Sequence, residues 1–344
     1  MRLAADHVRV RVPATSANLG PGFDALGLAL ALYDEIEVRA LGSPGVTVEV
    51  TGEGAGEVPD DERHLVVRAL RLGLDHAGAP QAGLHLVCRN RIPHGRGLGS
   101  SAAATVAGLV AARALVSEPE ALSDDVVVAL ATTFEGHPDN AAPAVLGGAT
   151  VAWEEPAAGT GSGTVGTARL EVHPDVVPVA LVPTVALSTA AARGVLPASV
   201  AHGDAAFQAG RAALLVHALG RRPELLLAAT ADRLHQEYRR AVMPESLAVV
   251  DALRARGVAA VVSGAGPTVL ALTRRASGPG TGRPDGNIAT GAGVVGTNGN
   301  APVPCTDADD VLREVVPAAT GGWRVLHLAV DQEGARAERV TPTA

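Results

Sequence analysis

The stretch Pro93-His94-Gly95-Arg96-Gly97-Leu98-Gly99-Ser100-Ser101-Ala102-Ala103 combines a glycine-rich loop with the start of an alanine-rich segment. Its three alternate glycines tolerate positive φ and carry no Cβ, so the backbone can fold tightly around a bulky anion. The alanine-rich segment predicts a helix from about residue 101 to 115. The first amides of a helix lack intrahelical partners and carry partial positive charge, which favours phosphate binding. An ordinary glycine-rich turn capped by serine is the alternative on these residues alone.

The glycine loop matches neither of the two common nucleotide-binding patterns. All 28 basic side chains are arginine, so the chain lacks the P-loop lysine, and it also lacks a lysine for a Schiff base or a general base. The dinucleotide pattern G-x-G-x-x-G fails because the glycines fall at alternate positions. Phosphate chemistry remains compatible with the sequence, since arginine and backbone amides can hold the same charge.

Composition narrows the class of protein further. The net charge of −8 disfavours a nucleic-acid partner, which would require a basic surface. Two cysteines are too few for a disulfide framework. Residues 1–12 lack the apolar core of a signal peptide, and the uncharged, apolar stretch at residues 257–273 is interrupted by glycine and proline. We therefore expect a cytoplasmic protein that does not enter a membrane.

On both sides of the loop, the sequence alternates strand and helix patterns. Val8, Val10 and Val12 alternate with arginine, as in a half-buried strand. Ser123 is a good N-cap for a helix that runs to about residue 135. Further helices are expected at residues 65–76, 201–219, 225–238, 245–256 and 309–316.

The order of these elements predicts an α+β protein with two domains, residues 1–168 and 169–344. Residues 153–168 are rich in Gly, Thr, Ser and Pro, as in a linker or a hairpin tip. The second domain reads as a strand, helices, two strands, a helix and a strand, which suits an antiparallel sheet with helices on one face. Residues 277–304 are aperiodic and rich in Gly, Pro and Asn, which predicts a disordered insertion.

The glycine loop resembles the signature P-x-x-x-G-L-G-S-S-A-A of the GHMP small-molecule kinases at every fixed position. Three further segments resemble motifs of this family in the family's order: Pro13-Ala14-Thr15-Ser16-Ala17-Asn18-Leu19-Gly20-Pro21-Gly22-Phe23-Asp24, Glu135-Gly136-His137-Pro138-Asp139-Asn140 and Ser263-Gly264-Ala265-Gly266-Pro267-Thr268. Four ordered matches are far more specific than one. The first of the three is similar to the opening of the branch that phosphorylates homoserine.

This resemblance implies a two-domain fold, with a ribosomal S5-like N-terminal domain and a ferredoxin-like C-terminal domain. It implies ATP as phosphoryl donor, held by residues 93–103, and L-homoserine as acceptor in threonine biosynthesis. Relatives are commonly dimers, so a homodimer is expected. His64 stands where the family often has asparagine, which leaves the adenine contacts open.

The motif at Glu135 is implied to carry much of the reaction chemistry. Ser100 and Glu135 are the implied Mg²⁺ ligands, a hydroxyl and a carboxylate that suit a hard cation. A solvated helix end is the alternative for Glu135. His137 and Asn140 are implied to face the substrate hydroxyl and the γ-phosphate. His137 could act as a general base, but this branch relies on positioning and charge stabilisation, so Glu135, His137 and Asn140 are assigned as catalytic without naming a base.

The acceptor is an amino acid, whose carboxylate suits arginine and whose ammonium group suits carboxylate or amide oxygens. Arg193 lies in a segment similar to the family's S-T-x-x-A-R-x-x-L-P, and Arg239, preferred over Arg240, resembles a second substrate arginine. Asn18 and Asp24 fill the family's ammonium-binding positions, although Asp24 could instead cap a turn. His137 completes the implied substrate set. Only motif position separates these arginines from ordinary surface residues.

Three other functions compete with this interpretation. Another GHMP kinase, of the mevalonate or sugar type, should lack the paired arginines and show an aspartate base. A catalytically silent regulator with this fold should have lost the carboxylate at position 135. A nicotinamide dehydrogenase is disfavoured by the glycine spacing. With no lysine in the chain, Arg96 is the first candidate for neutralising the γ-phosphate.

Overall fold

The computed structural model describes residues 1–155, 164–276, 308–316 and 322–341. The chain divides into two compact units: unit 1 comprises residues 1–170 and 330–344, and unit 2 comprises residues 171–329. The functional domains expected at 1–168 and 169–344 stay a prediction, and by contacts the C-terminal segment lies with unit 1. The insertion expected at 277–304 lies outside the described residues.

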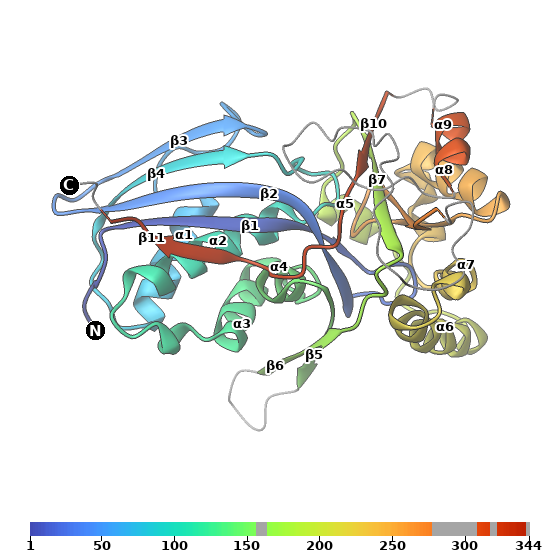
Figure 1. Ribbon diagram of the computed structural model, residues 1–344, viewed down its shortest axis with the longest axis horizontal. Coiled ribbons are helices and arrows are strands. Elements are labelled where there is room, and N and C mark those ends of the chain that lie inside the picture. The colour runs from blue at the N-terminus through green and yellow to red at the C-terminus, as the bar shows by residue number, and fades with distance from the viewer. Residues whose placement is uncertain (156–163, 277–307, 317–321, 342–344) are drawn as a thin grey trace, which may run out of the picture. The chain divides into compact units, whose positions relative to one another are not determined.

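Unit 1 is built on a seven-stranded sheet (Figure 1). The main strand order is β11-β1-β2-β4-β3, and β5 pairs with both β2 and β6. All pairs are antiparallel except β3 with β4. The strands are β1 His7–Ala17, β2 Leu26–Leu41, β3 Val46–Gly52, β4 Gly83–Asn90, β5 Ala149–Glu155, β6 Thr164–Leu170 and β11 Arg336–Arg339. Of the two alternatives for residues 153–168, a linker or a hairpin tip, the β5–β6 pairing supports the hairpin, and residues 156–163 lie outside the described residues.

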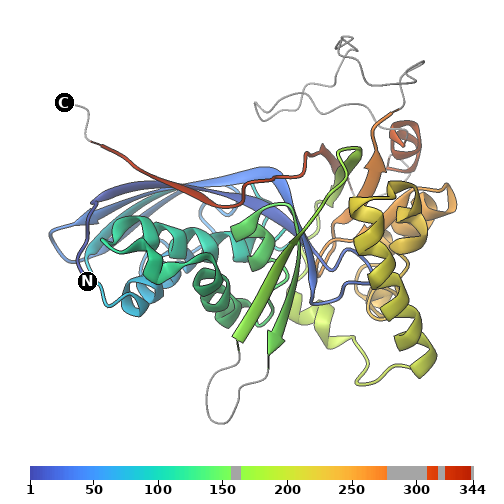
Figure 2. The ribbon, with the colours of Figure 1, turned by 60° about the horizontal axis from the view of Figure 1, so that its bottom comes forward.

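The helices of unit 1 gather on one face of this sheet (Figures 1 and 2). They are α1 Leu65–His76, α2 Ser100–Leu115, α3 Asp124–Glu135 and α4 Ala141–Leu146, with a short 3₁₀ turn η1 at Pro119–Leu122. The alternation predicted for β1 is confirmed, since Val8, Val10 and Val12 are fully buried while Arg9 and Arg11 are exposed. The helix predicted over residues 65–76 has those bounds in the structure.

Helix α2 lies close to α1 because small residues line their contact. A Cβ built on Gly108 would stand 2.4 Å from the carbonyl oxygen of Val66, and one on Gly73 would stand 2.7 Å from the Cβ of Ala112. Most of α2 is buried, which explains its alanine-rich composition. This packing fixes the start of α2 against the unit's core, where the glycine loop enters the helix.

Unit 2 has a four-stranded antiparallel sheet in the order β10-β7-β9-β8, as its sequence pattern predicts. The strands are β7 Val176–Pro183, β8 Ala259–Val262, β9 Val269–Arg274 and β10 Trp323–His327. The helices are α5 Thr189–Gly194, α6 His202–Gly220, α7 Leu226–Ala229, α8 Pro244–Ala255 and α9 Asp309–Val315, with 3₁₀ turns η2 at Pro223–Leu225 and η3 at Glu237–Ala241. Leu247 and Leu253 of α8, Leu312 of α9, and Val262 and Val269 of the sheet share one core.

One predicted helix is wrong. Residues 225–238 do not form a single helix: α7 ends at Ala229, and an irregular segment precedes η3. The cause is local, because the Asp232 carboxylate accepts hydrogen bonds from the amides of Leu234, His235 and Gln236. A side chain that binds these amides replaces the helical pattern there. Across the described residues, we find no helix with the length and apolar character needed to span a membrane.

Candidate active site

The glycine loop has the backbone conformation that its sequence predicts. Gly95, Gly97 and Gly99 adopt φ values of 62°, 73° and 69°, in the left-handed region that glycine tolerates. Gly99 is the N-cap of α2 and, as a glycine, offers no side chain to cap this helix end. The loop therefore delivers the chain to a helix N-terminus, the arrangement that suits a phosphate group. Within the loop, Arg96 Nη1 donates to the carbonyl of His94 at 2.8 Å.

The segment that leads into the glycine loop is held by a buried carboxylate. Asp34 Oδ1 on β2 accepts the backbone N–H of Arg91 at 2.6 Å and that of Ile92 at 2.9 Å. Burial raises the pKa of Asp34 to about 6, against the opposing effect of these two hydrogen bonds. Asp34 thus fixes the backbone immediately before Pro93, and sequence reasoning did not single it out.

Gly99 also makes a close approach that excludes a side chain. A Cβ at this position would stand 1.9 Å from Thr15 Oγ1 and 3.1 Å from Asn140 Oδ1. The Thr15 hydroxyl donates to Asn140 Oδ1 at 2.8 Å, and the Thr15 amide donates to the Leu98 carbonyl at 3.1 Å. The structure therefore brings β1, the end of the glycine loop and the predicted catalytic Asn140 together.

Asp139 orients the two predicted catalytic side chains beside it. His137 Nδ1 lies 2.6 Å from Asp139 Oδ1, and Asn140 Nδ2 donates to the same oxygen at 3.3 Å. Asp139 is only 1% exposed, so this carboxylate is shielded from water. A carboxylate acceptor at Nδ1 places the imidazole proton on that nitrogen and makes Nε2 the basic one. Asp139 is thus a positioning residue for His137 and Asn140.

Glu135 contacts the hydroxyl of Ser101 rather than that of Ser100. Ser101 Oγ donates to Glu135 Oε1 at 2.6 Å, and this pair joins the first turn of α2 to the end of α3. Gly136 ends α3 in the left-handed conformation, with φ of 78°, which turns the chain toward His137. The metal role of Ser100 stays a prediction, and Ser101 is a second hydroxyl in the same turn.

A cavity of about 740 Å³ opens beside this pair. Its size falls within the range typical of small-molecule and cofactor sites. Arg68 lies over the ring of Phe134 in its wall, 5.3 Å from the ring centroid. The cavity is lined by Glu62, Leu65, Arg68, Arg71, Leu72, Ser101, Thr133, Phe134 and Glu135.

The donors at this cavity fit Mg²⁺ that arrives with a phosphate ligand. Ser101 and Glu135 offer a hydroxyl and a carboxylate, the hard oxygen donors that Mg²⁺ prefers. Within the described parts of the chain, no group of three or more His, Cys, Asp and Glu side chains could hold a metal by itself. Kinase sites commonly bind Mg²⁺ through one or two carboxylates together with substrate phosphates, so a sparse protein ligand set is compatible with the metal.

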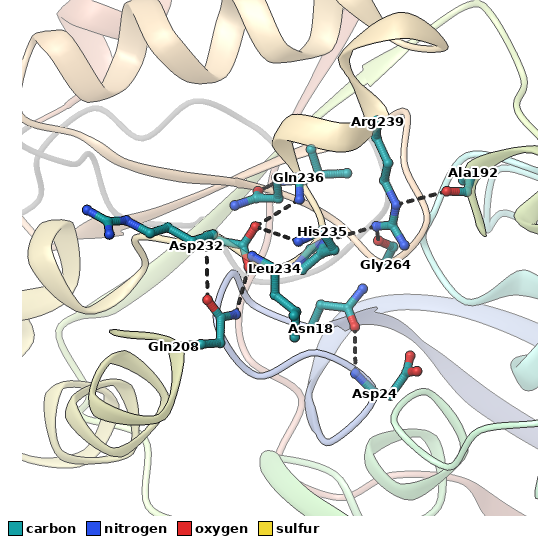
Figure 3. Close-up of polar contacts among 12 residues, drawn as sticks. Asn18, Asp24, Ala192, Gln208, Asp232, Leu234, His235, Gln236, Arg239 and Gly264 are labelled. Atoms are coloured by element: carbon teal, nitrogen blue, oxygen red, sulfur yellow. Dashed lines mark hydrogen bonds and ion pairs between the residues drawn. The ribbon is translucent and has the colours of Figure 1, made fainter. Parts of the chain in front are cut away.

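The predicted ammonium-binding residues lie in a strained turn of unit 1. Asn18 and Asp24 have φ values of 70° and 56°, and Asn18 Oδ1 accepts the Asp24 amide at 3.0 Å (Figure 3). Asn18 is 3% exposed. Asn and Asp tolerate this conformation better than most residues. The turn thus fixes Asn18 and Asp24 relative to each other.

In unit 2, Arg239 is buried, with 1% of its surface exposed. Its Nε donates to the Ala192 carbonyl at 3.3 Å, and its Nη1 donates to the Gly264 carbonyl at 2.9 Å (Figure 3). Ala192 precedes Arg193 on α5, so the structure brings the segments of both predicted substrate arginines together. Gly264 belongs to the late motif, residues 263–268. By contrast, Arg240 forms ion pairs with Glu237 and Asp251 at the surface.

Two buried histidines were not predicted as site residues. His235 lies against Arg239 Nη1 at 3.1 Å. His64 is 5% exposed at the N-terminus of α1, and its Nδ1 has no hydrogen-bond partner among the described residues. Burial, and secondarily the charge of His94, lowers the pKa of His64. Neither histidine lies in a fixed position of the four motifs. His64 stands where the family often has asparagine, whereas the sequence offered no signal for His235.

Two models of one protein family match this chain, one in each half of the sequence. The profile described as "GHMP kinases N terminal domain" matches residues 64–148, and "GHMP kinases C terminal" matches residues 206–279. A homoserine kinase of Streptomyces avermitilis is 58% identical over 78% of this chain and 87% of its own length. A homoserine kinase of Clavibacter michiganensis is 49% identical over 97% of this chain and 94% of its own length.

Solved structures show the same fold. The homoserine kinase of Cytophaga hutchinsonii superposes with a TM-score of 0.75 at 24% identity, over 97% of this chain and 98% of its own. A putative homoserine kinase of Listeria monocytogenes gives 0.68 at 29% identity, over 97% of this chain and all of its own. A mevalonate kinase of L. major superposes at 17% identity with a TM-score of 0.60, which shows similarity of fold alone.

Proposed function

The chain belongs to the GHMP kinase family, and from this premise we propose that it transfers the γ-phosphoryl group of ATP to the side-chain hydroxyl of L-homoserine. The products are O-phospho-L-homoserine and ADP, on the route to threonine. The observation that carries the proposal is the similarity to homoserine kinases along almost the whole chain. The same similarity disfavours two alternatives that the sequence left open, a regulator and a dehydrogenase.

On the donor side, the proposal assigns the ATP phosphates to the glycine loop and the N-terminus of α2. The positive-φ glycines and the uncapped helix end support this assignment. We assign the nucleoside to the cavity beside Ser101 and Glu135, whose volume and mixed lining suit a base and a ribose. Glu135 would hold Mg²⁺, with Ser100 or Ser101 as the hydroxyl ligand. Bound Mg²⁺ would neutralise charge on the phosphates during transfer.

On the acceptor side, the proposal assigns the carboxylate of homoserine to Arg193 and Arg239. Guanidinium groups bind carboxylates with paired, charge-assisted hydrogen bonds. Asn18 and Asp24 are assigned to the ammonium group, supported by the turn that fixes them relative to each other. Binding both charged ends of the amino acid leaves the side-chain hydroxyl as the group that can reach ATP.

The reaction then depends on positioning and charge stabilisation. Asp139 fixes the ring of His137 and the amide of Asn140, and we assign both to the acceptor hydroxyl and the transferred phosphoryl group. The Thr15 hydroxyl holds the oxygen of Asn140 and so directs its N–H₂ group. The hydroxyl oxygen of homoserine attacks the γ-phosphorus as the bond from this phosphorus to the leaving oxygen of ADP breaks. Since no side chain is assigned as the base, the hydroxyl proton is released to water.

A panel of acceptors tests this function. ADP release is measured with L-homoserine, mevalonate, galactose and shikimate, each with ATP and Mg²⁺. We expect turnover with L-homoserine well above that with the other three. Turnover with another acceptor and none with homoserine would overturn homoserine as the substrate. The absence of turnover with all four acceptors would overturn the proposed kinase activity.

We further propose that the enzyme works as a cytoplasmic homodimer, as its resemblance to the family implies. Light scattering on the purified protein should then give twice the chain mass of 34.6 kDa. A mass equal to one chain at assay concentration would contradict the dimer.

A further inference from the structure

A buried polar chain in unit 2 ends on the side chain of Arg239 (Figure 3). It runs from Gln208 on α6 to Asp232, then to His235, and then to the guanidinium group. Gln208 Nε2 donates to Asp232 Oδ1 at 2.7 Å, and Asp232 Oδ1 lies 3.5 Å from His235 Nε2. His235 Nδ1 lies 3.1 Å from Arg239 Nη1. The side chains of Asp232 and His235 are fully buried.

The hydrogen-bond chemistry defines the state of His235. A guanidinium group only donates, so the imidazole nitrogen that faces Arg239 must accept. His235 Nδ1 therefore carries a lone pair, and the ring proton lies on Nε2, the nitrogen that faces the Asp232 carboxylate. An imidazolium would place two cations in contact inside the protein, which is strongly unfavourable. His235 is thus a neutral link between a buried anion and a buried cation.

The Asp232 carboxylate accepts four hydrogen bonds. It accepts the amides of Leu234 at 3.1 Å, His235 at 3.1 Å and Gln236 at 2.8 Å, in addition to Gln208. The carbonyl oxygen of Gln208 in turn accepts the amide of the next residue, Arg233, at 3.0 Å. These bonds fix the position of the carboxylate, which fixes the plane of the His235 ring.

We propose that His235 is a positioning residue for Arg239, selecting the orientation in which this arginine binds the carboxylate of the acceptor. The inference rests on the proposed function and adds a residue to it. An arginine has a long, rotatable stem, and ordering it costs entropy that must otherwise be lost on binding. The bonds to His235, Gly264 and Ala192 order Arg239 before substrate arrives.

Two substitutions distinguish the effect of the Nδ1 acceptor of His235 from the effect of the volume of its ring. His235→Asn keeps an acceptor near the position of Nδ1, whereas His235→Leu fills the space without one. We expect His235→Leu to raise the KM for L-homoserine at least about 10-fold, with the KM for ATP and the kcat changed far less. His235→Asn should recover most of the affinity for homoserine. His217→Leu is the matched control, since His217 is an exposed histidine of α6, and it should change neither KM.

A double-mutant cycle with Arg239→Gln tests whether His235 acts through the arginine. If it does, His235→Leu should add little to the KM effect of Arg239→Gln, because the group it positions is gone. Homoserinol, which has an alcohol in place of the carboxylate, gives a second readout. The preference of the wild type for homoserine over homoserinol should fall in both single variants. Additive effects, or an unchanged KM in His235→Leu, would overturn the proposal.

The wild-type protein offers a test that does not depend on variants folding. With ¹⁵N-labelled histidine, long-range ¹H–¹⁵N NMR spectra distinguish the two neutral tautomers from the imidazolium, and the His235 signals are assigned by their loss in a variant. At neutral pH we expect the tautomer with the proton on Nε2. An imidazolium or a proton on Nδ1 would overturn the proposal. If the wild type turns over no homoserine, the proposed function fails first, whereas turnover with an unchanged KM in His235→Leu refutes only this inference.

Discussion

At the scale of single residues, strain and burial gather at positions assigned to the reaction. Among the described residues, Asn18, Leu19 and Asp24 are the non-glycine residues with positive φ, and two of them are assigned to the ammonium group. Such conformations cost on the order of 1–3 kcal/mol each and persist only where the surroundings enforce them. Motif positions could predict Asn18 and Asp24 from the sequence. The sequence could not predict the roles of positioning residues such as Asp139 and His235, because these roles depend on contacts that only the fold creates.

The first residue-scale prediction concerns the pH dependence of stability. Burial raises the pKa of Asp34 from 3.8 to about 6, so folding takes up a proton between those values. The stability that this proton contributes is full below about pH 4 and is lost as the pH rises through about 6. Asp34→Asn does not titrate, so its free energy of unfolding, relative to wild type, should rise by about 2–3 kcal/mol from pH 4 to 7.

Denaturant unfolding of both proteins across this pH range measures the difference. The comparison with wild type removes the contribution of all other titrating groups that the two proteins share. A difference between the two proteins that stays constant with pH would contradict the raised pKa of Asp34.

The second residue-scale prediction concerns the proposed Mg²⁺ ligands, Glu135 and one of the two serines at the start of α2. Glu135→Gln should lower kcat at least about 10-fold and raise the Mg²⁺ concentration needed for half-maximal rate, because a neutral amide is a poorer ligand for a hard cation. If the hydroxyl ligand is the partner of Glu135, Ser101→Ala should shift the Mg²⁺ dependence more than Ser100→Ala does. Steady-state rates at varied Mg²⁺ give the answer. Near-normal activity in Glu135→Gln would refute its role as a ligand.

At the scale of elements, periodicity predicts the helices whose packing is regular. The pattern over residues 65–76 predicts α1, and Ser123 correctly marks the start of α3, with its hydroxyl as acceptor for the Val126 amide. The expected helix over 225–238 fails because Asp232 binds backbone amides within it. Composition and period carry no signal for such a competing bond. The wrong helix prediction thus concerns the segment that positions Arg239.

The element-scale prediction concerns the contact between α1 and α2. Gly108→Ala should destabilise unit 1 by about 1–3 kcal/mol, because the new methyl group would stand 2.4 Å from the Val66 carbonyl and force the helices apart. This cost outweighs the gain in helix propensity, about 1 kcal/mol. Gly210→Ala, in the exposed interior of α6, is the matched control: its methyl group meets nothing within 4 Å, so it should stabilise. Thermal unfolding compares the two, and equal effects would contradict the packing.

At the scale of the whole molecule, the order of elements in the sequence predicts the α+β class. It does not predict that the C-terminal segment pairs with the first strand of unit 1. Strand β11 pairs with β1 over residues 336–339, and Arg9 forms an ion pair with Glu338. All four residues of β11 are exposed and three of them are charged, so the segment lacks the alternation of buried apolar and exposed polar side chains that marks a strand. Long-range pairing of this kind is invisible to local periodicity. The division into units therefore depended on the structure.

The most direct test of the proposed reaction is the identity of its product. Purified protein is incubated with L-homoserine, ATP and Mg²⁺, and the mixture is followed by ³¹P NMR and mass spectrometry. We predict one new phosphate monoester on the side-chain oxygen of homoserine, formed in equal amount with ADP. Release of inorganic phosphate without this ester, or an acceptor other than homoserine carrying the phosphate, would contradict the account.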